Sequence, residues 1–237
     1  MASSAYIPDV KGDDEDAVVH SAAVRITHWI NMISFIGLLV SGIAILLVHP
    51  RLYWGETGSV ETGSLIDLPL PFVLKGQNGW GRSLHFLSAW FSVVNGLVYV
   101  ASGLVTRHFG RNLLPARADL TWSSVTAFVS ELRMRREAKD ALAYNVHQRL
   151  AYAGVIFVLF PVLIWSGFAM SPALTSVFPV LVNLPGGQQS ARTIHFFVAS
   201  ALVLFLVGHV GMVWLTGFTK QLRAMITGRG TRGRERG

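Results

Sequence analysis

The sequence predicts an all-α membrane protein, built as a bundle of four transmembrane helices. Composition is the first reason: 51% of the 237 residues are hydrophobic and 14% are charged, whereas a soluble domain carries about 25% charged residues. The second reason is that four apolar stretches each exceed the roughly 18 residues that a helix needs to cross a bilayer. These stretches are continuously apolar rather than alternating, which excludes a transmembrane β-barrel.

The four predicted spans define the domain organisation. They cover residues 28–48, 84–105, 150–170 and 194–216. Pro161 lies in the third span and is expected to kink it. The spans and their loops form one membrane domain over 25–217, between a polar tail at 1–24 and a basic tail at 218–237.

The connecting segments predict the orientation. Basic residues gather between 107 and 139 and again between 220 and 236, while the loops after the first and third spans carry few for their length. Cytoplasmic loops are enriched in Lys and Arg, so both termini and the middle loop are expected on the cytoplasmic side of the membrane. Loops one and three are then expected to face the periplasm or the outside of the cell. Topology therefore explains the net charge of +7 better than nucleic-acid binding does. The polar N-terminus lacks the apolar core of a cleavable signal peptide.

Two loops carry predictions of their own. Loop one, residues 49–81, is long and rich in Gly, Pro and aromatic residues, which predicts an ordered periplasmic cap. The cap is either a docking surface for a periplasmic partner or a lid over the outer site. In the middle loop, Trp122, Val125, Val129 and Leu132 follow helical spacing, which predicts an amphipathic helix on the cytoplasmic membrane surface.

The fourth span carries the strongest functional signal. His195 and His209 are fourteen positions apart, which on a helix leaves them about 40° apart around the axis and about 21 Å apart along it. Ionisable groups inside a membrane are costly and usually functional. Two stacked imidazoles predict two metal centres at different depths, and the candidates are two b-type haems. The absence of cysteine excludes covalent c-type haem and cysteine-ligated iron–sulfur clusters.

Each haem needs a second axial histidine from another span. His28 opens the first span on the inner side, and His85 opens the second span on the outer side. Matching depths pairs His28 with His209 at the inner haem and His85 with His195 at the outer haem. A bis-histidine site leaves no axial position for a substrate, so such sites carry single electrons.

Three of these histidines follow an arginine by three positions. The pairs are Arg25 with His28, Arg82 with His85, and Arg192 with His195. Three residues make about one helical turn, so each arginine lies on the ligand's face but nearer the surface. There it can bind the haem propionates through its guanidinium fork. The alternative is that these arginines are interfacial anchors of the kind found at helix starts.

The other histidines are interpreted more simply. His20, His49 and His108 lie in the tail or at span ends, where a solvated or interfacial side chain is expected. His147 opens the third span on the inner side. It acts either in proton transfer near the inner haem or as a capping or surface residue.

These motifs resemble the bacterial cytochrome b561 / nickel-hydrogenase b-type cytochrome family. The matching segments are RITHW in the first span, GRSLHF in the second, YNVHQRLAY in the third and the two histidines of the fourth. The family includes the membrane cytochrome b subunits of formate dehydrogenases and hydrogenases. The segments HPRLYWGETG and GGQQSARTIHFFVA are most similar to the branch labelled thiosulfate reductase cytochrome b, whose partners are often periplasmic molybdopterin oxidoreductases.

The resemblance implies an electron-transfer subunit rather than a stand-alone catalyst. A periplasmic oxidoreductase subunit, such as a molybdopterin enzyme or hydrogenase, would exchange electrons with the outer haem, and quinone would react near the inner haem. Asn145 matches an asparagine at the quinone site of formate dehydrogenase relatives. Asn145 and Gln148 either hydrogen-bond quinone or cap the helix, and His147 lies in the same pattern. The alternative is a stand-alone quinone-coupled cytochrome, similar to superoxide oxidase, which needs no partner.

Overall fold

A computed structural model describes residues 17–18, 21–58, 62–70, 79–106, 151–215 and 217–230. Within them, four helices are long and apolar enough to cross a membrane. They are α1 (Ala22–Val48), α2 (Gly79–Val105), the third span (Ala151–Ala169) and α8 (Gln188–Leu215). The four predicted spans are therefore present.

Three of the helices begin about one turn or more before the predicted apolar stretch. Their first turns carry polar residues, which lower the hydropathy without breaking the helix. Ser21 caps α1, because its hydroxyl accepts a hydrogen bond from the Val24 amide at 3.4 Å. At α8, the carbonyl of Gly55 accepts from the amides of Gln189 and Ser190. Both contacts satisfy amides that a helix N-terminus leaves without an internal partner.

The third span is distorted where its proline predicts it. A π-helical segment, η3 (Val155–Leu159), runs into α5 (Phe160–Ala169), and Pro161 lies in the first turn of α5. Proline has no amide hydrogen, and its ring crowds the carbonyl four residues earlier. A wider π turn accommodates that loss.

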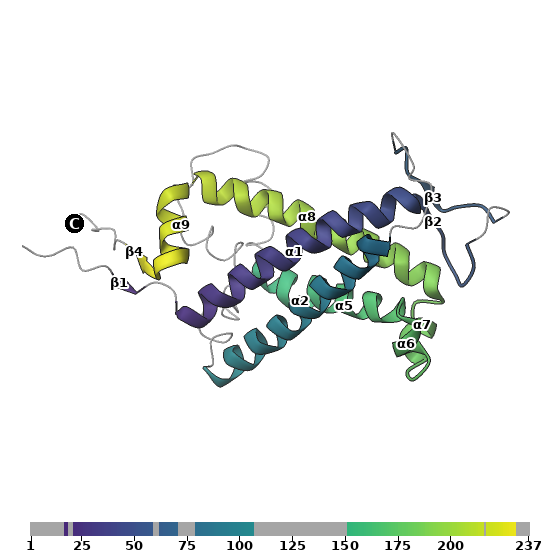
Figure 1. Cartoon of the computed structure of the whole chain (residues 1–237), viewed down its shortest axis with the longest axis horizontal. Helices are drawn as coiled ribbons and strands as arrows, with labels where there is room; N and C mark the ends of the chain where they lie inside the picture. Colours follow the sequence, from purple (N-terminus) through teal and green to yellow (C-terminus); the bar gives the residue numbers. More distant parts are fainter. Residues whose placement is uncertain are drawn as a thin grey trace, which may run out of the picture.

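The spans associate as two pairs, which Figure 1 shows as α1 beside α2 and α5 beside α8. Small residues allow α1 and α2 to approach closely: a Cβ on Gly37 would collide with the hydroxyl of Ser88. Buried Asn95 of α2 also donates to the Thr27 carbonyl at 2.8 Å and to Asn31 Oδ1 at 3.1 Å. Within the described residues, no comparably extensive backbone packing joins one helix pair to the other.

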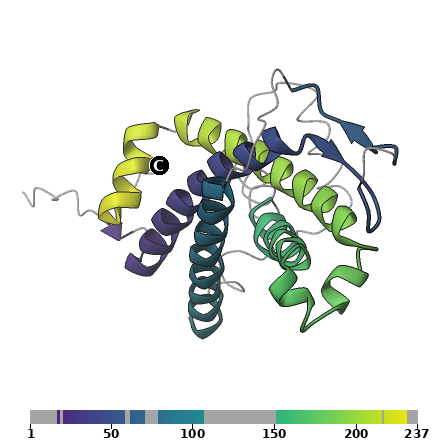
Figure 2. The same cartoon turned by 45° about the vertical axis from the view of Figure 1, so that its right-hand side comes forward.

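One end of the bundle, here called the outer end, is covered by part of loop one. Strands β2 (Arg51–Leu52) and β3 (Ile66–Asp67) form an antiparallel ribbon closed by an Arg51–Asp67 ion pair at 3.2 Å. The short helices α6 (Pro172–Thr175) and α7 (Val180–Asn183) lie between α5 and α8. Figure 2 shows the ribbon well separated from α9.

Loop one is fastened to the start of α8. The Gly55 amide donates to Ser190 Oγ at 2.7 Å, and the Thr193 hydroxyl donates to the Tyr53 carbonyl at 2.6 Å. Gly187 is required at this junction, because its φ is +122° and an added Cβ would lie 2.5 Å from the carbonyl carbon of Gly55. Residues 59–61 and 71–78 of the predicted cap lie outside the described residues.

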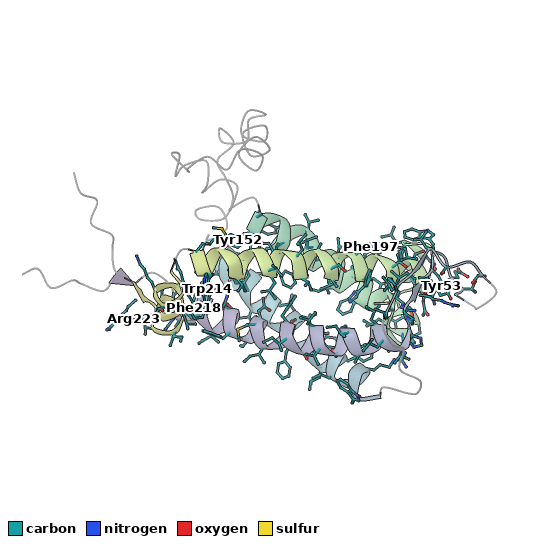
Figure 3. All side chains as sticks on the ribbon, turned by 90° about the horizontal axis from the view of Figure 1, so that it is seen from above. Tyr53, Tyr152, Phe197, Trp214, Phe218 and Arg223 are labelled. Atoms are coloured by element: carbon teal, nitrogen blue, oxygen red, sulfur yellow. The ribbon has the colours of Figure 1, made fainter. Side chains whose placement is uncertain are left out.

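The opposite end, here called the inner end, carries both ends of the described chain. Strand β1 (Ala17–Val18) pairs antiparallel with β4 (Arg229–Gly230). Helix α9 (Phe218–Thr227) precedes β4, so the predicted basic tail begins with a helix that the apolar pattern did not reveal. Figure 3 shows Tyr53 at the outer end and Arg223 of α9 at the inner end.

Contacts with α1 hold α9 in place. The indole of Trp29 donates to the Met225 carbonyl at 3.2 Å, and the Arg25 guanidinium donates to the Ile226 carbonyl. The chain turns from α8 into α9 at Gly217, whose φ is +104°. The predicted amphipathic helix around residues 122–132 lies outside the described residues.

Candidate metal centres

The structure brings the four span histidines together in two pairs. His28 of α1 faces His209 of α8, with ring centroids 6.5 Å apart and ring planes 50° apart. His85 of α2 faces His195 of α8, with centroids 6.2 Å apart and planes 61° apart. We call these the inner pair and the outer pair. They are the pairs that depth matching predicts from the sequence, and the unbroken helix α8 supplies one member of each.

The spacing of each pair fits one metal ion between two imidazoles. Metal–nitrogen bonds of about 2.0 Å on each side place the two ring centres roughly 6 Å apart, and both observed separations agree. No cluster of three or more His, Cys, Asp or Glu side chains occurs in the part of the chain that the structure describes. Two protein ligands per centre suit a haem iron, whose four other positions belong to the porphyrin.

Hydroxyl groups surround the outer pair. Ser41 Oγ lies 2.9 Å from His85 Nδ1, and Ser166 Oγ lies 3.0 Å from His195 Nδ1. Both serines are fully buried, at 0% exposure. Each contact occupies Nδ1 of a ring and leaves its Nε2 available for a metal. Sequence reasoning did not predict either contact with a histidine, since each serine comes from a different helix than the histidine it contacts.

Aromatic rings surround the inner pair. The Phe205 ring stacks beside His209, with centroids 6.1 Å apart and planes 19° apart. Trp29 lies edge-on to His28 at 5.8 Å. The hydroxyl of Tyr152 lies 3.5 Å from His209 Nδ1, which is the outer limit of a hydrogen bond. Figure 3 shows Tyr152 toward the inner end, on the same side as Trp214.

The three predicted propionate arginines lie at the ends of the bundle. Arg25 donates to the Ile226 carbonyl at the inner end, and Arg192 donates to the His49 carbonyl at the outer end. Arg82 is exposed. Two of the three guanidiniums thus hold backbone carbonyls, a role that the sequence did not predict. A guanidinium has five N–H donors, so these contacts leave donors for a carboxylate.

His49 adds a further polar group at the outer end. The side chain is exposed and directly follows α1. Partial desolvation and the nearby guanidiniums of Arg192 and Arg82 lower the pKa of His49. The sequence placed His49 at an interfacial span end, and its proximity to both arginines was not predicted. The proposed quinone residues Asn145, His147 and Gln148 lie outside the described residues.

Comparison with known proteins identifies the family. The family model for prokaryotic cytochrome b561 matches residues 19–228. The chain is 30% identical over 214 residues to a putative protein-methionine-sulfoxide reductase subunit, YedZ1, of Azospira oryzae, covering 89% of this chain and 96% of that protein.

Two further relatives are probable Ni/Fe-hydrogenase B-type cytochrome subunits. The one from Cupriavidus necator is 25% identical and covers 86% of this chain and 85% of its own length. The one from Bradyrhizobium diazoefficiens is 26% identical and covers 81% and 75%. No solved structure shows significant similarity. Because the family model spans nearly the whole chain, this protein belongs to the prokaryotic cytochrome b561 family.

Proposed function

We propose that this chain is a di-haem b-type cytochrome subunit that transfers electrons across the membrane between a periplasmic oxidoreductase subunit and the quinone pool. The observation that carries the proposal is the pair of facing imidazoles at each of two levels, with ring separations of 6.5 and 6.2 Å. Family membership supports haem b as the cofactor.

Each histidine pair would supply the two axial ligands of one haem. His28 and His209 would hold the inner iron, and His85 and His195 would hold the outer iron. Haem b ligated in this way supplies one-electron redox chemistry without an open coordination position. Arg25 serves the propionates at the inner end, and Arg82 and Arg192 serve those at the outer end. In a bilayer, four apolar spans of this length would limit the access of water to both centres.

The relatives and the outer end support an oxidoreductase partner. The relatives are named as a putative protein-methionine-sulfoxide reductase subunit and as probable Ni/Fe-hydrogenase B-type cytochrome subunits. In this chain, loop one is held against α8 by the Gly55, Ser190 and Thr193 hydrogen bonds, which gives the outer end a fixed surface close to the outer pair. A fixed surface favours docking over a loose lid. We place this end in the periplasm, because the basic residues of the sequence favour a cytoplasmic location for both termini.

The quinone site belongs to the opposite side of the membrane. Asn145, His147 and Gln148 precede the third span at its inner start, which places them near the inner haem in the proposed topology. Amide and imidazole groups can donate hydrogen bonds to quinone oxygens.

Haem content tests the proposal directly. We expect the full chain, purified after haem-replete expression, to give a b-type reduced-minus-oxidised spectrum with two haems per chain. His195→Ala should lower this to one, because it removes a ligand of the outer iron alone, and His209→Ala should remove the inner haem instead. His49→Gln is the matched control and should keep both haems. A colourless wild-type protein, or full haem content in both ligand variants, would contradict the proposal.

A further inference from the structure

Two distant segments repeat one short pattern around the outer histidines. Residues 41–44 of α1 read Ser-Gly-Ile-Ala, and residues 166–169 of α5 read Ser-Gly-Phe-Ala. The serine and alanine of each segment are buried. Each serine contacts a histidine on the neighbouring helix of its own pair: α1 serves α2, and α5 serves α8. Each helix pair therefore brings both a ligand and its serine to the outer centre.

The serine hydrogen bonds fix the direction of each contact with a ring. Ser41 Oγ lies 2.6 Å from the Gly37 carbonyl, and Ser166 Oγ lies 3.0 Å from the Leu163 carbonyl. A carbonyl only accepts, and a hydroxyl has one hydrogen to give. With that hydrogen on the carbonyl, the serine oxygen accepts from the Nδ1–H of the imidazole. Both rings then carry their proton on Nδ1, which leaves the lone pair on Nε2.

The glycines of the pattern set the position of the rings. A Cβ on Gly42 would lie 3.7 Å from Cε1 of His85, and a Cβ on Gly167 would lie 3.5 Å from Cε1 of His195. Each ring edge therefore rests close to glycine backbone, where a side chain larger than a methyl would displace it. The serine orients the ring through Nδ1, and the adjacent glycine leaves space for it.

We infer that Ser41 and Ser166 are positioning residues of the outer centre, which hold His85 and His195 in the Nδ1–H tautomer and increase their electron donation to the metal. The inference rests on the proposed haem function. Partners that accept from the second nitrogen of a metal-bound histidine fix its orientation and raise its basicity. A more basic ligand stabilises the oxidised iron, so these hydroxyls should lower the potential of the outer haem. Helix packing alone, the commoner use of serine in membrane helices, predicts no such effect.

Replacement by alanine tests this inference. In the full chain, Ser41→Ala and Ser166→Ala should each raise the midpoint potential of the outer haem in a redox titration and leave the inner potential unchanged. Haem retention at the outer centre should weaken by about tenfold or more. Ser41→Thr and Ser166→Thr keep the hydroxyl and should restore the wild-type potential. Ser34→Ala is the control, because Ser34 is also buried on α1 and no hydrogen bond to a ring is seen for it among the described residues.

The outcomes separate this inference from the proposed function. If the wild-type protein binds two haems and both alanine variants keep the wild-type outer potential, the serines do not position the ligands. If an alanine variant loses the outer haem while its threonine counterpart retains it, the hydroxyl is required and the inference holds. Equal loss in the alanine, threonine and Ser34 variants would show a packing role and overturn it. A wild-type protein without haem would instead refute the proposed function.

Discussion

The two histidine pairs share a helix and a spacing but differ in their surroundings. The rings lie 6.2 Å apart in the outer pair and 6.5 Å apart in the inner pair. Serine hydroxyls contact both outer rings at Nδ1, whereas aromatic rings pack around the inner pair. Second-sphere hydrogen bonds and polarity tune the potential of a haem with unchanged axial ligands. If each pair holds a haem, as proposed, this difference predicts two centres of different potential within one chain.

The two ends of the bundle are also closed differently. At the outer end, loop one is joined to the first turn of α8 by backbone and hydroxyl hydrogen bonds around Gly55. At the inner end, α9 folds back on α1 through Trp29 and Arg25. Both closures depend on a glycine with positive φ, Gly187 at the outer end and Gly217 at the inner end. An added side chain at Gly187 would meet backbone atoms, whereas among the described residues one at Gly217 would meet only Lys220. We therefore expect a substitution at Gly187 to destabilise the protein more than the same substitution at Gly217.

The largest effect is expected from Gly187→Ala. A non-glycine residue in a left-handed conformation costs about 1–2 kcal/mol, and here the Cβ would also lie 2.5–2.6 Å from backbone atoms of Gly55 and Glu56. Loop one should separate from α8, with loss of outer haem and a lower apparent melting temperature. Thermal unfolding in detergent and haem content measure both effects.

Gly217→Ala is the matched control at the inner end. Its φ is also positive, but an added Cβ meets only Lys220 Cβ at 3.9 Å. The variant should therefore lose about 1–2 kcal/mol of stability through backbone strain alone, and it should keep the outer haem. A greater loss of stability in Gly217→Ala than in Gly187→Ala would contradict the expectation that the outer closure is the more sensitive of the two.

The sequence predicts the spans and the histidine pairs because both depend on one-dimensional patterns. Hydropathy locates a span, and a spacing of fourteen residues places two histidines on one helix face whatever surrounds them. The serine contacts depend on which helices pack together. Ser41 and Ser34 are both buried on α1, and only the packing of α1 on α2 shows that Ser41 contacts His85. Likewise, the contact of Ser166 with His195 can be recognised only when the packing of α5 on α8 is known.

Helix α9 escaped prediction for a related reason. Its ten residues are too few and too polar to form a span. Its position depends on two of its backbone carbonyls, which accept hydrogen bonds from Trp29 and Arg25 of α1. The arginine spacing predicted guanidiniums near the ends of the bundle, and their role toward haem propionates stays a prediction. It did not predict that Arg25 and Arg192 also hold backbone carbonyls, because those carbonyls belong to segments far away in the sequence.

An intermediate effect is expected from Asn95→Val, which acts on the inner half of the bundle. Asn95 is 5% exposed and donates to the Thr27 carbonyl and to Asn31 Oδ1. Interhelical hydrogen bonds in membranes contribute about 1 kcal/mol, so the variant should be destabilised by about that amount. Thr27 adjoins His28, and the inner haem spectrum should therefore change while the outer one does not. Ser88→Ala, a buried change on the same helix, is the control, and an altered outer spectrum in Asn95→Val would contradict the assignment.

The smallest effect is expected from Tyr152→Phe, and it sharpens the contrast between the pairs. The Tyr152 hydroxyl lies 3.5 Å from His209 Nδ1, where a hydrogen bond is weak, while its ring packs edge-on against His209 with centroids 6.3 Å apart. Phenylalanine keeps the ring, so the inner midpoint potential should stay almost unchanged in a redox titration, and Tyr152→Ala should disturb it more. A shift in Tyr152→Phe as large as the outer shift in Ser166→Ala would mean that a hydroxyl tunes both centres. The aromatic surroundings of the inner pair would then no longer explain a difference in potential.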